Sequence, residues 1–119
     1  MKTQFYNKVK QVAENNAMAC ELRENYYRDG TYTVSVSFQF SDVFRTHSRT
    51  LMRHIKPLKG GKVNFWEVTI HDCKHHISGP GYYSWPNYDH IYKNVELTEV
   101  LQDFIREIEN DARFYRPNS

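Results

Sequence analysis

Alternating hydrophobic and polar positions in the middle of the chain predict three β-strands. The clearest run covers residues 32–40, where tyrosine, valine and phenylalanine at even positions alternate with threonine, serine and glutamine. A period of two over nine residues predicts a strand with one buried and one hydrated face. Residues 43–58 suit a strand or a short helix, and we favour the strand. A hairpin turn at residues 59–62 would lead from it into a third strand over residues 63–73.

Apolar residues at three- and four-residue steps predict a helix near each end of the chain. The first helix is expected over residues 3–25, which contain neither glycine nor proline. For the last one, Thr98 is the expected N-cap, an apolar stripe runs from Leu101 to Ile108, and Pro117 lies beyond the expected end. Residues 77–93 lack a helical period and contain Gly79-Pro80-Gly81, which predicts a long irregular loop that could include a short strand near Ile91 and Tyr92.

These elements predict one α+β domain over residues 1–119. Its expected order is an N-terminal helix, a three-stranded antiparallel meander, an irregular aromatic loop and a C-terminal helix. Both helices would pack on one face of the sheet, because that arrangement buries both apolar stripes. No segment reaches the roughly 20 apolar residues of a membrane-spanning helix, and no signal peptide is evident. With two distant cysteines that we interpret as reduced thiols, the expected location is cytoplasmic.

The charges are segregated along the chain. No acidic residue occurs between Asp42 and Glu67, whereas six basic residues do, and the C-terminal helix is mainly acidic. On a strand, Arg45, Arg49 and Arg53 would share one face and form a positive stripe suited to phosphates or to an acidic protein surface. The alternative is a hydrated strand face whose charges only prevent aggregation. The predicted partner-binding residues of this segment are Arg45, Arg49, Arg53, Lys56, Lys59 and Lys62.

The predicted loop is rich in large rings, and Tyr82, Tyr83, Trp85 and Tyr88 are its candidate contact residues. Tyrosine and tryptophan are enriched at interface hot spots and also stack on unpaired bases. The loop could instead fold back and close one end of the core. We expect two or three of its rings to remain accessible.

A histidine-rich segment offers candidate metal ligands. His71, Cys73 and His75 would point the same way on a strand, and His90 would complete a tetrahedral zinc set. Their spacing does not match the paired ligands of structural zinc sites, and the alternative is solvated, neutral histidines. We therefore expect no bound metal and no other cofactor.

The function that best fits these patterns is that of a small non-catalytic interaction protein. It would dock on a protein or nucleoprotein partner through the basic hairpin and the aromatic loop. Regulators or inhibitors of larger enzymes, including those of viral or mobile-element type, act in this way. A single-stranded nucleic-acid or RNA-binding protein is the first alternative, and a metal-dependent hydrolase built on residues 71–76 is the second. Neither a phosphate-binding glycine loop nor a serine-hydrolase elbow occurs.

Overall fold

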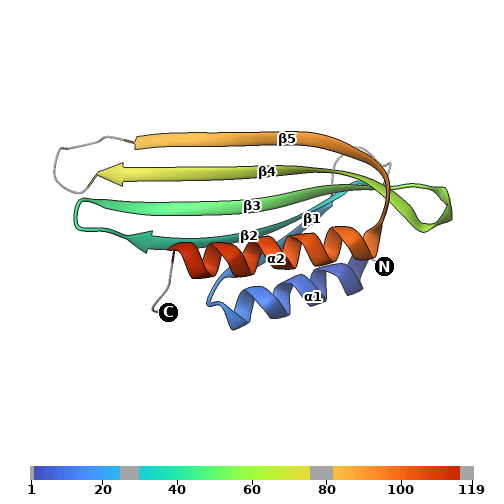
Figure 1. Cartoon of the computed structure of the whole chain (residues 1–119), viewed down its shortest axis with the longest axis horizontal. Coiled ribbons are helices and arrows are strands. Elements are labelled where there is room, and N and C mark those ends of the chain that lie inside the picture. The colour runs from blue at the N-terminus through green and yellow to red at the C-terminus, as the bar shows by residue number, and fades with distance from the viewer. Residues whose placement is uncertain (1, 25–29, 76–81, 116–119) are drawn as a thin grey trace.

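The computed structural model describes residues 2–24, 30–75 and 82–115, with the side chains of residues 74–75 and 82–91 left undescribed. Five strands form one antiparallel sheet in which sequence neighbours are also neighbours in space (Figure 1). A 3₁₀ turn, η1, connects β3 to β4. The elements are α1 (Lys2–Asn15), β1 (Ala19–Glu24), β2 (Tyr32–Ser41), β3 (Arg45–Pro57), η1 (Lys59–Gly61), β4 (Lys62–His75), β5 (Tyr82–Glu96) and α2 (Leu97–Tyr115).

The α+β class, the two terminal helices and the antiparallel sheet are confirmed. The expected three-stranded meander is wrong in its number of strands, because β1 and β5 extend it at its two edges. The sequence pattern places residues 19–24 in the first helix and most of residues 82–93 in a loop, whereas in the structure they form β1 and most of β5. The three central strands match their predicted ranges closely.

The first helix ends ten residues earlier than predicted because the chain reverses direction after Asn15. Ala17 has a φ of 55°, a left-handed conformation that cannot continue an α-helix. The side chain of Asn16 donates to the carbonyl of Val12 at 2.8 Å, and the amide of Met18 donates to the carbonyl of Ala13 at 2.8 Å. These bonds satisfy the last carbonyls of α1 and direct the chain into β1.

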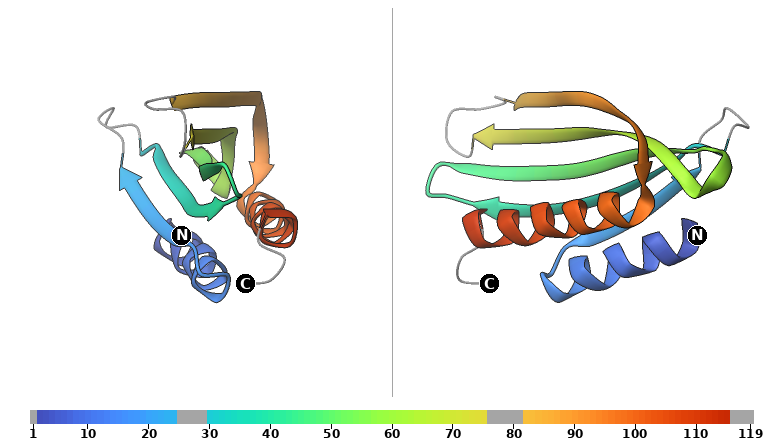
Figure 2. Two further views of the ribbon diagram at one scale, coloured as in Figure 1. Left: turned by 90° about the vertical axis from the view of Figure 1, so that its left-hand side faces the viewer. Right: turned by 45° about the vertical axis from the view of Figure 1, so that its right-hand side comes forward.

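Strand β5 contains Pro86, which pairs in register with Ile70 of β4. Proline has no N–H to donate to a neighbouring strand, so it is rare in a central strand, which is bonded on both sides. An edge strand can accommodate it on the side that has no neighbour. Because β5 pairs with β4 alone, it tolerates the proline that made this segment look irregular in the sequence. Figure 2 shows β5 bending at its C-terminal end to lead into α2.

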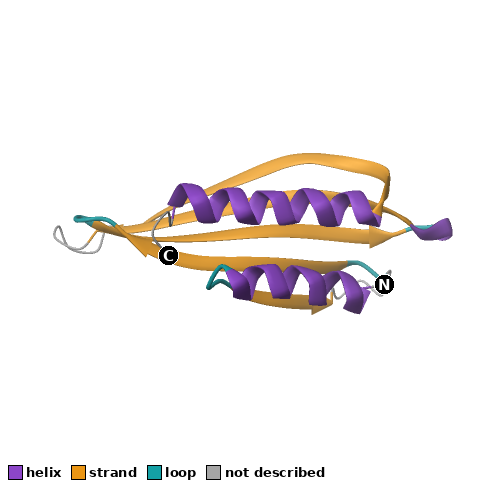
Figure 3. Cartoon of the chain, turned by 60° about the horizontal axis from the view of Figure 1, so that its bottom comes forward, coloured by secondary structure: helices purple, strands orange, loops and turns teal. Residues whose placement is uncertain are grey.

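Both helices lie against the same face of the sheet and run in the same direction (Figures 1 and 3). Phe5, Val9 and Ala13 of α1 and Val100, Phe104 and Ile108 of α2 are buried against the sheet. The sheet contributes Val34, Val36, Leu51 and Ile55, all fully buried, as alternation predicts for one face. Among the described residues, no helix is long and apolar enough to cross a membrane.

Candidate functional site

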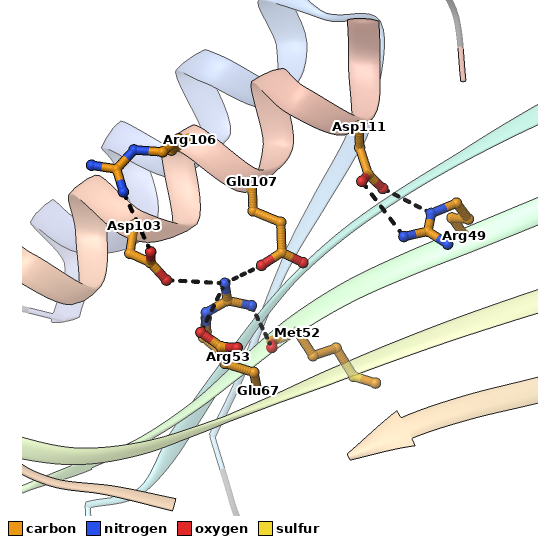
Figure 4. Close-up of polar contacts among 8 residues, drawn as sticks. All are labelled: Arg49, Met52, Arg53, Glu67, Asp103, Arg106, Glu107 and Asp111. Atoms are coloured by element: carbon orange, nitrogen blue, oxygen red, sulfur yellow. Dashed lines mark hydrogen bonds and ion pairs between the residues drawn. The ribbon is translucent and has the colours of Figure 1, made fainter. Parts of the chain in front are cut away.

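Two of the three arginines on β3, Arg49 and Arg53, face the acidic helix α2 and not the solvent (Figure 4). The Arg53 side chain is completely buried, and its guanidinium lies 4.6 Å from the centre of the Phe104 ring. Nη2 of Arg53 lies 3.3 Å from Glu67 and also donates to Glu107. Three carboxylates surround this buried cation: those of Glu67, Asp103 and Glu107.

Arg49 makes a second ion pair with α2, one helical turn beyond Glu107. Its Nε donates to Oδ2 of Asp111 at 2.8 Å, and both side chains are mostly buried, with exposed fractions of 14% and 12%. Its guanidinium lies 4.4 Å from the centre of the Tyr115 ring. Each buried arginine therefore has a carboxylate partner and an aromatic face, both supplied by α2.

These positions change the role expected for two of the three arginines. Arg45, Arg49 and Arg53 do lie on one strand face, but Arg53 is inaccessible and Arg49 nearly so. The accessible one is Arg45, which lies 3.6 Å from Asp42 with 44% of its side chain exposed. A partner could reach only Arg45 of the stripe. The reason is long-range: α2 begins 40 residues after the end of β3 and covers it with acidic side chains.

The three lysines of the basic segment are placed differently and remain at the surface. Lys56, Lys59 and Lys62 surround the β3–β4 turn and form what we term the lysine tip. Lys62 lies 4.0 Å from Glu96, whereas the structure gives Lys56 and Lys59 no ion-pair partner within its described part. Gly60 and Gly61 have φ values of 85° and 84°, which non-glycine residues adopt at a cost.

A pocket of about 300 Å³ opens beside the lysine tip. Its walls are mainly apolar, and two lysine side chains contribute to its lining. The pocket is formed where the β3–β4 turn meets the starts of α1 and α2, at one end of the molecule. Its lining residues are Lys2, Gly30, Tyr32, Pro57, Leu58, Gly61, Lys62, Val63 and Leu97.

At the opposite end of β3, two histidines form a hydrogen-bonded chain. Nη1 of Arg49 lies 3.1 Å from Nδ1 of His71, and Nε2 of His71 lies 2.9 Å from Nδ1 of His47. Nε2 of His47 lies 3.0 Å from Asp42. Because Arg49 has only donors, Nδ1 of His71 accepts, and each ring then donates from Nε2 to the next acceptor. The Phe40 ring stacks on the His47 ring with their centres 4.6 Å apart, so packing as well as hydrogen bonding holds these side chains in place.

The pKa shifts of the side chains in this hydrogen-bonded series have local causes. The hydrogen bond from His47, with the amides of Phe44 and Arg45, lowers the pKa of Asp42 to about 2. Burial, followed by the positive charge of Arg49, lowers the pKa of His71. Both effects favour an ionised Asp42 and a neutral His71 at neutral pH, the states that this bonding pattern requires.

The metal hypothesis gains no support from the two candidate ligands that are described. His71 has both ring nitrogens within hydrogen-bond distance of other groups, one of them the Arg49 guanidinium. Cys73 is buried beside it, with 1% of its surface exposed. Over the part of the chain whose side chains are placed, no three His, Cys, Asp or Glu residues gather as metal ligands. The side chains of His75 and His90 lie outside that part.

The candidate aromatic residues 82–88 belong to strand β5, and the loop expected there is not found. Tyr83 is paired in register with Cys73, Trp85 with His71 and Tyr88 with Val68. Their side chains lie outside the described residues, so their role as contact residues stays a prediction.

Sequence reasoning missed a second cavity, a groove of about 470 Å³ between α2 and strands β4 and β5. Its residues come from three separate segments, so no local pattern predicts it. The one available signal was the set of acidic residues at the start of α2. No known protein family and no curated protein matches this sequence. Its function is therefore inferred from its own residues.

Proposed function

We propose that the protein is a small non-catalytic interaction protein that docks on an acidic macromolecular partner through the lysine tip. Such docking is how regulators and inhibitors of larger enzymes or nucleoprotein complexes act. The observation that carries this proposal is the apolar pocket of about 300 Å³ directly beside the exposed lysines.

The charge distribution supports an acidic partner. Arg49 and Arg53 are neutralised inside the molecule, so they contribute little to the outward field. Lys56 and Lys59 are exposed and have no acidic neighbour in sequence between residues 43 and 66. A surface of one sign steers a partner of the opposite sign and raises the association rate.

The pocket supports a partner segment that carries an apolar residue among its acidic ones. Binding energy at interfaces comes mainly from desolvated anchors in pockets, while charges at the rim add specificity. Leu58, Val63 and Leu97 would contact the anchor, and the lysine tip would contact the carboxylates beside it. A peptide with a leucine flanked by glutamates has this chemistry.

The test uses fluorescence anisotropy with a labelled Glu-Glu-Leu-Glu-Glu peptide at two salt concentrations. The wild-type protein should bind it, and peptides with serine for leucine or glutamine for glutamate should bind less tightly. Reversal of two exposed charges in Lys56→Glu/Lys59→Glu should weaken binding about tenfold. The control Lys8→Glu/Lys10→Glu reverses two charges on α1, and it should bind as the wild type does.

Two outcomes would overturn the proposal. One is equal affinity of the Lys56→Glu/Lys59→Glu variant and the wild type for the acidic peptide. The other is tight binding of oligo(dT) in preference to the peptide, with a steep loss of affinity on adding salt, which would favour the nucleic-acid alternative.

A further inference from the structure

The groove between α2, β4 and β5 combines aromatic rings with carboxylates. Phe65 and Tyr92 stack with their ring centres 4.8 Å apart and an angle of 13° between planes, and Tyr92 remains 41% exposed. The wall formed by α2 carries Glu99 and Asp103, and Arg106 lies at its edge. The full lining is Phe65, Glu67, Tyr92, Val95, Glu99, Val100, Gln102, Asp103 and Arg106.

The same molecule twice places a guanidinium between a ring and a carboxylate. Arg53 lies over Phe104 and pairs with Glu107, and Arg49 lies over Tyr115 and pairs with Asp111. The groove supplies the ring and the carboxylates of a third such arrangement. Within the described residues, no cation lies over the Tyr92 ring, and Glu99 has no ion-pair partner.

The charges in and behind the groove leave a negative surplus. Four carboxylates are involved, those of Glu67, Asp103, Glu107 and Glu99. Two cations, Arg53 and Arg106, oppose them, which leaves a formal charge of −2. That sign disfavours an anionic ligand, and an apolar ligand would bury carboxylates without a partner. A volume of about 470 Å³ lies within the usual range of ligand pockets, roughly 300–1,000 Å³.

We propose that this groove binds an arginine side chain of a partner protein. Arginine fits better than lysine, because its planar guanidinium can stack on Tyr92 while its N–H groups reach carboxylates at the edge. Glu99 and Asp103 supply those carboxylates, one helical turn apart on α2. The site is separate from the lysine tip and takes a ligand of opposite charge, so either site can exist without the other.

Arg106 provides a sharp test, because it competes for the same carboxylate. Its Nη1 lies 3.8 Å from Oδ1 of Asp103, and 70% of its side chain is exposed. If the groove binds a guanidinium, Arg106→Gln should bind an added guanidinium more tightly, about threefold for one exposed pair removed. Arg113 lies on the same helix but outside the groove, so Arg113→Gln serves as the control.

The experiment titrates the ¹⁵N-labelled full chain with N-acetyl-arginine amide and follows the backbone amide signals. Shifts should concentrate at Phe65, Tyr92 and Glu99 and saturate in the millimolar range. The neutral analogue N-acetyl-citrulline amide should cause much smaller shifts. Glu99→Gln should weaken binding severalfold, and Tyr92→Leu should weaken it while keeping apolar contact with Phe65, whereas Glu109→Gln should leave it unchanged.

Equal shifts with arginine and citrulline amides would overturn the proposal, and so would the absence of saturable shifts in the wild type. Loss of binding in Tyr92→Leu counts only if its thermal unfolding midpoint stays near that of the wild type. Tighter binding by Arg106→Gln does not depend on that condition, because a damaged fold would not increase affinity. Lysine-tip variants should leave these shifts unchanged, which separates this site from the docking surface.

Discussion

Replacing Arg53 with methionine should strongly destabilise the fold. The Arg53 side chain is completely buried and pairs with carboxylates from β4 and α2, so it links the sheet to the helix. The Arg53 guanidinium lies 4.6 Å from the centre of the Phe104 ring. A methionine side chain should keep an apolar contact with that ring. The substitution therefore removes the charge with little loss of packing, and it leaves Glu67 and Glu107 without their cation.

The size of the effect follows from the burial of the remaining carboxylates. Only 14% of the Glu67 side chain and 30% of the Glu107 side chain are exposed, so their lost pairing is only partly replaced by water. Breaking a buried pair costs about 3–5 kcal/mol, and partial exposure places this case near 3 kcal/mol. That is a large part of the roughly 5–15 kcal/mol that stabilises a domain of this kind.

Urea unfolding followed by circular dichroism measures the change. Arg45→Met is the matched control on the same strand, because Arg45 is 44% exposed and its loss should cost under about 1 kcal/mol. In the double variant Arg53→Met/Glu107→Met, stability should partly recover, since one uncompensated carboxylate is gone. An Arg53→Met variant that loses less than about 1 kcal/mol with an unchanged m-value would refute this reasoning.

Three further predictions concern titration, backbone conformation and thiol reactivity. Because burial lowers the pKa of His71 and of His54 in the folded state, the unfolded chain binds more protons below pH 6.5. Unfolding free energy should fall as pH decreases from there, and His71→Gln should flatten the decrease measured in urea. Gly60→Ala, at a φ of 85°, should cost about 1–2 kcal/mol in the same assay. Burial raises the pKa of Cys20 to about 11, so at pH 8 about one molecule in a thousand has the thiolate, and iodoacetamide should label it slowly until urea unfolds the chain.

Strand β2 was predictable from nine alternating residues with one face in the core. β3 and β4, which alternate over shorter runs, were predictable with the help of the glycine turn between them. The edge strands were not, for two different physical reasons. Strand β1 has only six residues, of which Cys20 and Leu22 are half-buried, so its alternation is too short to separate from the helical stripe before it. Strand β5 contains Pro86, which the sheet accepts because β5 lies at an edge.

The pairing of β3 with α2 could not be predicted from local patterns. The sequence separates Arg53 from Glu107 by 54 residues and Arg49 from Asp111 by 62. Each segment alone resembles a hydrated, charged surface, and only their contact removes both from water. The opposite signs of the two segments were visible in the sequence, but charge alone does not distinguish a partner molecule from another part of the same chain.

Two features of the sequence make this distinction. One is whether a basic residue is arginine or lysine, and the other is whether it occupies an odd or an even position of the strand. Arg45, Arg49 and Arg53 occupy odd positions of β3, on the same face as the fully buried Leu51 and Ile55. Residues on that face must be buried wherever a helix covers the sheet, and a guanidinium tolerates burial beside carboxylates and rings better than an ammonium does. The lysines lie around the turn that comes next, with Lys56 near the end of β3, Lys59 in η1 and Lys62 at the start of β4. A basic segment that changes from arginine on the core face to lysine at a turn therefore divides into an internal ion-pair layer and an exposed basic surface, the one that we propose as the docking site.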